Sequence, residues 1–233
     1  MIITTNNTIV IIPAYNEEKS VGTVVRALPH EQVREVIVVN NNSTDQTAEQ
    51  AAQAGATVLL QPLRGYGNAC LKGLEYAATL NPAPDIVVFI DADFSDFPEE
   101  LPLLVAPIAS GEMDMVIGSR VLGKRERGSM TIPQVFGNWL ATRLIRWFYG
   151  VRFTDLGPFR AIRYDKLVEL NMRDPTYGWT VEMQVKAAKH RLRCTEIAVR
   201  YRRRSAGVSK VSGTIKGTFL AGYKIIKTIF QYR

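Results

Sequence analysis

The chain has 233 residues, of which 46% are apolar, and a net charge of +7, which suits one globular α/β domain with a buried core. Its two cysteines have no Cys or His partner at metal-ligand spacing, which argues against a disulfide framework or zinc site and favours a reducing compartment. We find neither a signal peptide nor an apolar run of the roughly 20 residues that a membrane span needs, and expect a cytoplasmic protein, soluble or peripheral to a membrane.

Short β-branched runs alternate with helical segments in the first half of the chain. Strands are predicted at Thr8–Pro13, Glu35–Val39, Thr57–Leu60 and Asp85–Ile90. The segments between them predict helices at Asn16–Leu28, at Asp45–Ala54 and from Arg64–Gly67 through Ala77. Because the strands are continuously apolar, we expect an α/β fold whose mostly parallel sheet has helices on both faces.

The second half continues this pattern with more basic and aromatic residues. Helices are predicted from Pro98 to Ala109, at Pro133–Tyr149, late in Phe159–Leu170, at Val181–His190 and at Thr214–Phe230. Strands are predicted near Met113–Gly118, early in Phe159–Leu170 and at Glu196–Tyr201, and basic loops at Val121–Thr131 and Arg202–Lys210. Without a repeat or linker, we predict one domain over 1–233, in which residues 120–233 are built onto 1–119.

Four polar segments lie where predicted strands end or helices begin: Tyr15–Glu17, Asn40–Ser43, Arg64–Gly67 and Asp91–Asp93. Open α/β sheets bind ligands outside the carboxyl ends of their strands. We therefore expect these segments to converge on one crevice.

Asp91 and Asp93 leave a predicted buried strand together. Two carboxylates this close repel each other unless a cation or water separates them. Mg²⁺ or Mn²⁺ takes such oxygen ligands, usually with phosphate oxygens, and neutralises charge on a nucleoside-diphosphate leaving group. The alternative is an acidic turn that caps the next helix, because Asp-x-Asp alone is a weak pattern.

Arg64 precedes a predicted helix in the sequence R-G-Y-G. An arginine and free backbone N–H groups at a helix N-terminus suit a phosphate, whereas the alternative is a glycine turn with a surface arginine. The chain lacks both the P-loop pattern and a G-x-G-x-x-G after its first strand, which argues against those nucleotide sites.

Seven motifs extend over nearly the whole chain: VIIPAYNEE (Val10–Glu18), VVNNNSTDQT (Val38–Thr47), RGYGNA (Arg64–Ala69), FIDADFSDFPE (Phe89–Glu99), GSR (Gly118–Arg120), DLGPFRA (Asp155–Ala161) and RSAGVSK (Arg204–Lys210). Because these motifs occur in this order, the chain resembles family 2 glycosyltransferases with the GT-A fold. Within them it is most similar to the dolichyl-phosphate mannose synthase and polyprenyl-phosphate glucosyltransferase branch. The resemblance implies a Rossmann-like sheet with acceptor-side helices.

The resemblance also implies roles for individual residues. Asp91 and Asp93 would bind the metal, with Asp96 as a further candidate, and the catalytic residues would be Asp93, Asp155 and Glu182. Acceptor contacts would come from Arg120, Arg143 and Arg160. The nucleotide sugar would be held by Pro13, Ala14, Tyr15, Glu17, Asn40, Asn42, Arg64, Asp91, Ala92, Arg204, Ser209 and Lys210.

One motif departs from the family. The usual V-V-D-D-G-S is here Val38–Ser43, V-V-N-N-N-S. An asparagine still accepts a hydrogen bond from a base N–H, but without charge. This leaves the base open, and we favour UDP over GDP.

Charge divides unevenly along the chain. Residues 1–119 hold 5 Lys and Arg against 15 Asp and Glu, whereas residues 120–233 hold 24 against 7. The basic half predicts an anionic partner, although it can also be a solvated face. The segments Pro133–Tyr149 and Thr214–Phe230 combine aromatic and basic residues, as interfacial helices do, or they pack on the core. We expect peripheral membrane attachment, direct or through a membrane-embedded partner protein.

The expected reaction is inverting transfer of a hexose from a nucleotide sugar to a polyprenyl or dolichyl phosphate. A lipid phosphate is already an anion, so Asp155 would mainly position the acceptor; for a hydroxyl acceptor it would be the leading base. The alternatives are transfer to a saccharide hydroxyl, a nucleotidyltransferase and a non-catalytic binding module. No nucleic-acid recognition motif is present.

Overall fold

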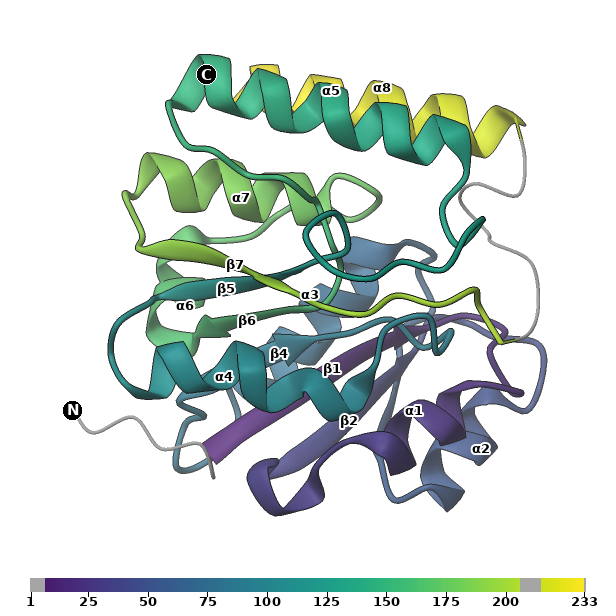
Figure 1. The fold of residues 1–233 in the computed structure, drawn as a ribbon. Coiled ribbons are helices and arrows are strands. Elements are labelled where there is room, and N and C mark those ends of the chain that lie inside the picture. Colours follow the sequence, from purple (N-terminus) through teal and green to yellow (C-terminus); the bar gives the residue numbers. More distant parts are fainter. Residues whose placement is uncertain (1–6, 206–214, 233) are drawn as a thin grey trace.

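The computed structural model describes residues 7–205 and 215–232, and seven strands form one sheet at its centre (Figure 1). The strands are β1 (Thr8–Ala14), β2 (Glu35–Asn40), β3 (Thr57–Leu60), β4 (Ile86–Phe89), β5 (Met115–Ser119), β6 (Arg160–Arg163) and β7 (Cys194–Ala198). Their order is β3-β2-β1-β4-β6-β5-β7. Neighbouring strands are parallel except on the two sides of β6, which is antiparallel to β4 and β5.

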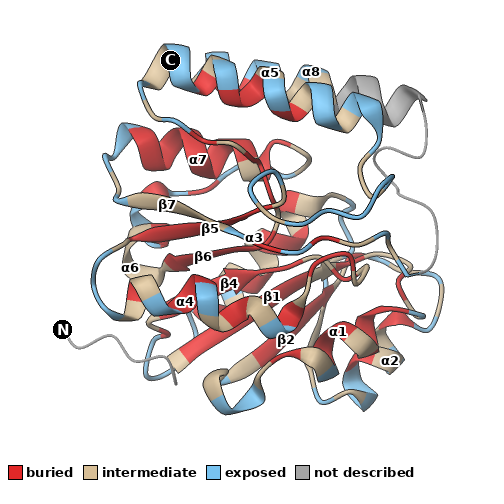
Figure 2. Cartoon of the chain, in the orientation of Figure 1, coloured by how far each residue is buried: buried red, intermediate tan, exposed pale blue. Residues whose placement is uncertain are grey.

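Both faces of the sheet are buried, which explains why its strands are continuously apolar (Figure 2). Alternate residues of β1 show the arrangement, since Ile9 and Ile11 belong to one apolar cluster and Val10 and Ile12 to the other. The second cluster is completed by α1 (Val21–Ala27), α2 (Thr47–Gln53) and α4 (Leu101–Ala109).

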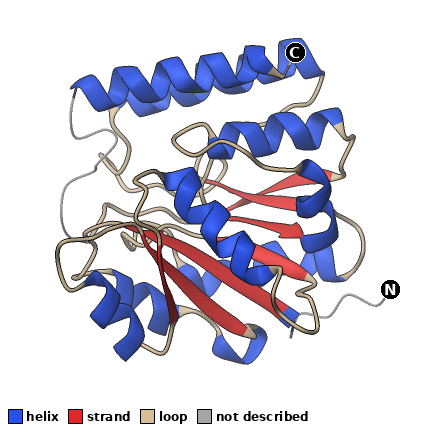
Figure 3. Cartoon of the chain, turned by 180° about the vertical axis from the view of Figure 1, so that it is seen from behind, coloured by secondary structure: helices blue, strands red, loops and turns tan. Residues whose placement is uncertain are grey.

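The first cluster lies under a thicker layer of helices. It is covered by α3 (Tyr66–Ala77), α5 (Ile132–Tyr149), α6 (Tyr164–Leu170), α7 (Trp179–Lys189) and α8 (Ile215–Gln231). Helices α5 and α8 lie side by side outside α7, as Figures 1 and 3 show from opposite sides, and Phe148 meets Phe230 edge-on at 5.0 Å between ring centroids. The 3-10 helices His30–Gln32 and Pro98–Glu100 are also present.

The predicted alternation of strands and helices is confirmed; most boundaries shift by one or two residues, and two larger differences have an evident cause. Helix α1 begins at Val21 rather than at Asn16, because Asn16 has a φ of 52° and bonds to Ser43 and Thr44 in the loop after β2. Strand β7 begins and ends earlier than predicted, since Cys194 pairs with Met115 at the start of β5.

Candidate active site

The polar segments predicted to converge do so at the carboxyl ends of β1, β2 and β4. They surround a cavity of about 300 Å³, here called the strand-end cavity. Its lining consists of Pro13, Ala14, Tyr15, Glu17, Asn41, Arg64, Gly65, Tyr66, Ala69, Asp91, Ala92, Asp93, Thr176, Tyr177 and Arg204. Proline, tyrosine, carboxylate and guanidinium groups from segments far apart in sequence thus share one site.

Asp91 and Asp93 both border this cavity but have different surroundings. Asp91 Oδ1 is inaccessible to solvent and has no hydrogen-bond partner among the described residues. Burial, and then repulsion from Asp93, raises the pKa of Asp91 to about 7. Asp93 accepts hydrogen bonds from the Ser95 N–H at 2.9 Å and from Arg204 Nε at 3.3 Å. A cation beside Asp91 would therefore meet an oxygen whose hydrogen bonding the described residues leave incomplete.

Arg204 joins the two acidic sides of the strand-end cavity. Its Nη2 lies 2.6 Å from Glu17 Oε1 and 3.2 Å from Asp93 Oδ2. Burial raises the pKa of Glu17, while the Arg204 charge opposes that rise. The guanidinium is therefore placed where it can also meet the phosphates of a bound nucleotide.

The acidic pair fits a divalent metal only if the ligand completes the coordination. Within residues 7–205 and 215–232, no group of three His, Cys, Asp or Glu side chains is arranged to hold a metal ion. Asp96, the further candidate, is buried with both carboxylate oxygens unpartnered in the described part of the chain, and burial raises its pKa well above the usual range. Mg²⁺ and Mn²⁺ often take two carboxylates plus substrate phosphates and water, which suits Asp91 and Asp93.

Tyr15 and Arg64 form another part of the cavity wall. The Arg64 guanidinium carbon lies 3.1 Å from the centroid of the Tyr15 ring, a cation–π contact. Arg64 thus lies at the cavity as predicted, but two amides of the helix end beside it are already used. The Gly67 N–H donates to the Thr176 carbonyl at 3.2 Å and the Asn68 N–H to the Pro175 carbonyl at 2.9 Å.

The two glycines of R-G-Y-G allow the turn to pack against the loop at 174–177. Gly65 has a φ of 143°, and a Cβ there would lie 2.2 Å from the Pro175 carbonyl oxygen. At Gly67 a Cβ would lie 1.8 Å from the Asp174 carbonyl oxygen. The turn and the loop at 174–177 can therefore pack together only without side chains at these positions.

Of the three consecutive asparagines, Asn41 lines the strand-end cavity. Its Nδ2 donates to the Gln61 and Leu63 carbonyls at 3.0 and 2.7 Å, and its Oδ1 accepts from the Gly65 N–H at 2.7 Å. Asn40 and Asn42, predicted to hold the nucleotide sugar, are outside this lining. Asn40 Oδ1 accepts a hydrogen bond from the Ser43 N–H, and Asn42 is exposed with a φ of 60°.

Glu182 lies beneath the 174–177 loop rather than in a cavity. Its fully buried carboxylate accepts hydrogen bonds from the Arg173 and Asp174 N–H groups and pairs with Lys186 at 2.7 Å. It also accepts from the Tyr232 hydroxyl at 2.6 Å. The predicted catalytic role does not fit this location, because the carboxylate is fully used in holding the loop.

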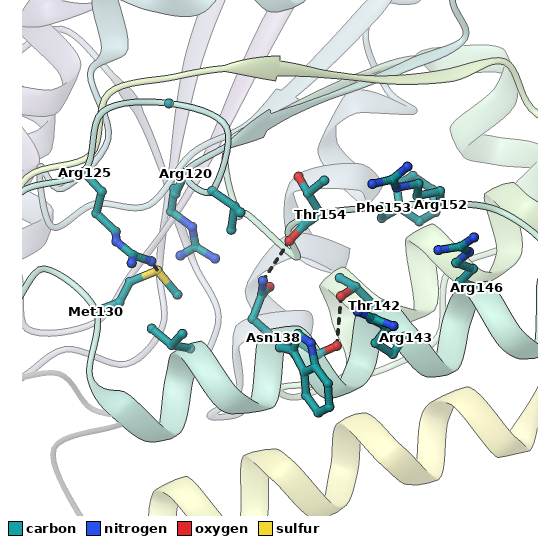
Figure 4. A pocket seen from close by; sticks show the side chains of 14 residues that line it. Arg120, Arg125, Met130, Asn138, Thr142, Arg143, Arg146, Arg152, Phe153 and Thr154 are labelled. Atoms are coloured by element: carbon teal, nitrogen blue, oxygen red, sulfur yellow. Dashed lines mark hydrogen bonds between the residues drawn. The ribbon is translucent and has the colours of Figure 1, made fainter.

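A second cavity of about 550 Å³ lies between the loop after β5 and helix α5 (Figure 4). We call it the arginine cavity. Its lining is Arg120, Val121, Gly123, Arg125, Met130, Val135, Asn138, Trp139, Thr142, Arg143, Arg146, Arg152, Phe153 and Thr154. No Asp, Glu or His of the described residues appears in this lining, which contains five guanidinium groups.

Asp155 and Arg120 meet at the inner wall of the arginine cavity. Arg120 Nε lies 2.8 Å from Asp155 Oδ2 and Nη2 lies 2.7 Å from Oδ1, while the Arg120 N–H donates to Oδ2 at 2.8 Å. Asp155 is fully buried. Burial is the largest influence on the pKa of Arg120 and acts to lower it, but the Asp155 charge and hydrogen bonds, with smaller contributions from Tyr201 and Asp96, together raise that pKa. Asp155 therefore orients Arg120.

Comparison with known proteins decides the family. The model of glycosyl transferase family 2 matches residues 9–170, well over half of the chain. The chain belongs to glycosyl transferase family 2. An uncharacterised glycosyltransferase of Mycobacterium tuberculosis is 37% identical over 215 residues, which cover 91% of this chain and 93% of that protein. A dolichyl-phosphate hexose transferase of Haloferax volcanii is 30% identical over 228 residues, covering 96% and 94%.

A solved structure extends the likeness to the whole fold. Glucosyl-3-phosphoglycerate synthase from Mycobacterium tuberculosis, in complex with Mn²⁺, UDP-glucose and phosphoglyceric acid, superposes with a TM-score of 0.71 at 26% identity. The match covers 97% of this chain and 79% of that chain. The predicted GT-A fold of this family 2 glycosyltransferase is thereby confirmed.

Several residues of the family 2 prediction lie elsewhere than expected. Arg160, a predicted acceptor contact, is fully buried, and its guanidinium donates to the carbonyls of Leu156, Gly157 and Thr180. It is therefore part of the interior. Ser209 and Lys210 lie outside the described residues. Conversely, Thr176 and Tyr177 line the strand-end cavity from a loop that carries no recognisable motif.

Proposed function

We propose that this glycosyltransferase moves a hexose from a nucleoside-diphosphate sugar to the phosphate of a polyprenyl or dolichyl phosphate. The observation that carries the proposal is the lining of the arginine cavity, which has five arginines and no Asp, Glu or His. A hydroxyl acceptor needs a base to take its proton, whereas a phosphate monoester arrives as an anion. Asp155 has both oxygens committed to Arg120, which leaves it poorly suited as that base.

The donor would bind in the strand-end cavity, with Tyr15 and Arg64 on the nucleotide and Arg204 near the diphosphate. Asp91 and Asp93 would hold Mg²⁺ or Mn²⁺, which neutralises charge on the diphosphate as it leaves. Arg204 would add to that neutralisation, because its guanidinium already lies between Glu17 and Asp93. We favour a UDP sugar, since the solved neighbour binds UDP-glucose with Mn²⁺.

Arg120 would orient the acceptor phosphate for direct displacement at the anomeric carbon, which inverts its configuration. Its fork-shaped guanidinium is held rigidly by Asp155 and borders the cavity, so orientation needs little further ordering. Arg125 and Asn138 line the same part of the cavity. The lipid acceptor is supported by the dolichyl-phosphate hexose transferase among the relatives.

The proposed acceptor places the reaction at a membrane surface. No helix in the described part of the chain is long and apolar enough to span a bilayer. We propose peripheral contact on the cytoplasmic face, directly or through a membrane-embedded partner protein.

A hydroxyl acceptor is the second candidate, since the solved neighbour is complexed with phosphoglyceric acid. The two candidates separate in one assay. Purified protein with Mn²⁺ is offered UDP-glucose, UDP-galactose, UDP-N-acetylglucosamine and GDP-mannose in turn, against polyprenyl phosphate, the corresponding polyprenol and phosphoglyceric acid. We expect a glycosylated polyprenyl phosphate from one donor, lost in Asp93→Asn and kept in the exposed-site control Glu49→Gln. Product only from polyprenol or phosphoglyceric acid would refute the proposal.

A further inference from the structure

Three exposed arginines, Arg143, Arg146 and Arg152, lie at the end of the arginine cavity away from Arg120 and Arg125 (Figure 4). We call them the outer arginines. Arg143 and Arg146 are three residues apart on α5 and therefore point the same way. Helix α5 ends at Gly150, whose φ of 72° turns the chain, and Arg152 comes back to line the same cavity. The fold thus brings together three cations that are not needed if Arg120 orients the acceptor phosphate.

The outer arginines have no counter-charge among the residues that the structure describes. None of them takes part in the ion pairs found among the described residues, and no carboxylate lines their cavity. Neighbouring like charges are unfavourable, more so where protein walls replace part of the water. An anion with several oxygens removes that cost, and guanidinium groups bind phosphate oxygens in pairs. This end of the cavity is therefore suited to a phosphate group.

The surroundings favour a lipid headgroup over a free phosphate. Trp139 and Trp147 are 50% and 78% exposed on the same helix, and the Arg143 guanidinium lies 5.6 Å from the Trp139 ring. Helix α8 lies alongside and exposes Tyr223 and Phe230. Tryptophan and arginine together on an exposed helix suit the boundary between lipid headgroups and acyl chains, where rings bury partly and cations meet phosphates. A free phosphate has no apolar part that could contact these exposed rings.

We propose that the outer arginines are a binding site for the headgroup of an anionic membrane phospholipid, separate from the acceptor phosphate. Occupation of this site holds α5 against the bilayer with the cavity opening toward the lipid acceptor. The proposal rests on the proposed function only for the position of that acceptor. Binding to vesicles is measured without donor or acceptor, so its failure is distinct from failure of the transferase assignment.

The test compares two double variants that each remove two charges. Arg143→Gln/Arg146→Gln changes the site, and Lys19→Gln/Arg26→Gln changes exposed residues at α1, on the opposite face of the sheet. Each protein is titrated with vesicles of phosphatidylcholine alone and of phosphatidylcholine containing phosphatidylglycerol. A blue shift of tryptophan emission reports contact, because Trp139 and Trp147 are exposed and Trp179 is already buried.

We expect the wild type and the α1 variant to bind the anionic vesicles alike, with a blue shift. The Arg143→Gln/Arg146→Gln variant should bind about 30-fold more weakly, because each cation near an anionic surface contributes about 1 kcal/mol. Arg152→Gln alone should show part of this loss. Equal binding by both double variants would overturn the proposal. So would saturable binding of inorganic phosphate at these arginines, seen by calorimetry, in a protein that ignores anionic vesicles.

Discussion

Asp155 and Arg120 form a two-pronged ion pair in which both carboxylate oxygens accept from one guanidinium, at 2.8 and 2.7 Å. The carboxylate is buried, whereas the guanidinium borders the arginine cavity. The buried Asp155 therefore holds the Arg120 guanidinium at the cavity, and substitution of either residue should disturb the same acceptor contact.

Asp155→Asn should act through acceptor binding. The amide cannot hold the guanidinium by charge at both prongs, so we expect KM for polyprenyl phosphate to rise about tenfold or more while kcat falls less than tenfold. Arg120→Lys should reproduce the effect, because ammonium lacks the fork. Steady-state kinetics check this, with the exposed Arg127→Lys as control. A fall in kcat of about a hundredfold or more with unchanged KM would instead identify Asp155 as a base.

Stability of the metal-free protein should depend on Asp91. Its pKa is raised to about 7, above the unfolded value of about 3.9, so the folded state binds more protons between these values. Asp91 should therefore contribute a fall in the free energy of unfolding as pH rises from about 4 to 7, by at most about 1.4 kcal/mol per pH unit, in addition to the contributions of Asp96 and Glu17, whose pKa values burial also raises. Urea unfolding at several pH values measures this slope. Asp91→Asn should make the slope between pH 4 and 7 shallower; an unchanged slope in that variant would contradict the assignment.

Addition of Mn²⁺ should reverse this dependence. Metal binding requires the deprotonated carboxylate, so the ion should raise the midpoint temperature of thermal unfolding at pH 8 and have little effect on it at pH 5.5. Differential scanning fluorimetry with a nucleoside diphosphate present provides the measurement. Equal stabilisation at both pH values would show that Asp91 does not bind the ion.

Gly67→Ala should open the strand-end cavity. The new Cβ would lie 1.8 Å from the Asp174 carbonyl oxygen, so the loop carrying Thr176 and Tyr177 must move. We expect a loss of stability of about 1–3 kcal/mol, as for overpacking, together with weaker donor binding by calorimetry. Gly137→Ala is the matched control, since no atom lies within 4 Å of a Cβ there and alanine favours a helix. Equal behaviour of both variants would refute this account.

Glu182→Gln should affect the same loop from below. Loss of the charge weakens the hydrogen bonds to the Arg173 and Asp174 N–H groups and leaves Lys186 without its buried partner. We expect a loss of about 3 kcal/mol in stability and a higher KM for the donor, with kcat largely kept at saturation. Glu169→Gln, in a surface pair with Lys166, should change little. Abolished turnover in a folded Glu182→Gln protein would restore a catalytic role.

The sheet and the acidic pair could be predicted because they depend on local patterns. Apolar β-branched runs mark buried strands, and Asp91 and Asp93 follow one directly. The choice among three consecutive asparagines could not be predicted, since Asn41 is selected by carbonyls at Gln61 and Leu63. The contacts of a charged residue likewise depend on the tertiary structure and cannot be read from local patterns.

Arg160 and Glu182 illustrate that limit. Both carry charges that suggest ligand contacts, yet both are buried and satisfied within the protein, Arg160 partly by the Thr180 carbonyl and Glu182 partly by the Arg173 and Asp174 N–H groups. The contribution of Thr176 and Tyr177 was missed for the converse reason, because only the close approach of the 174–177 loop to Gly65 and Gly67 places them at the cavity.

The single reversed strand in the sheet acts as a spacer. Strand β6 lies between β4 and β5, so the carboxyl ends of those strands are two strand spacings apart, or about 10 Å. Asp91 follows one of these ends and Arg120 the other. Hydrogen bonding between strands, and not the length of any loop, therefore sets the distance between the two strand ends, which the donor and acceptor would together span. Substitutions in the loops can change which molecules bind on either side, but this distance is a property of the sheet.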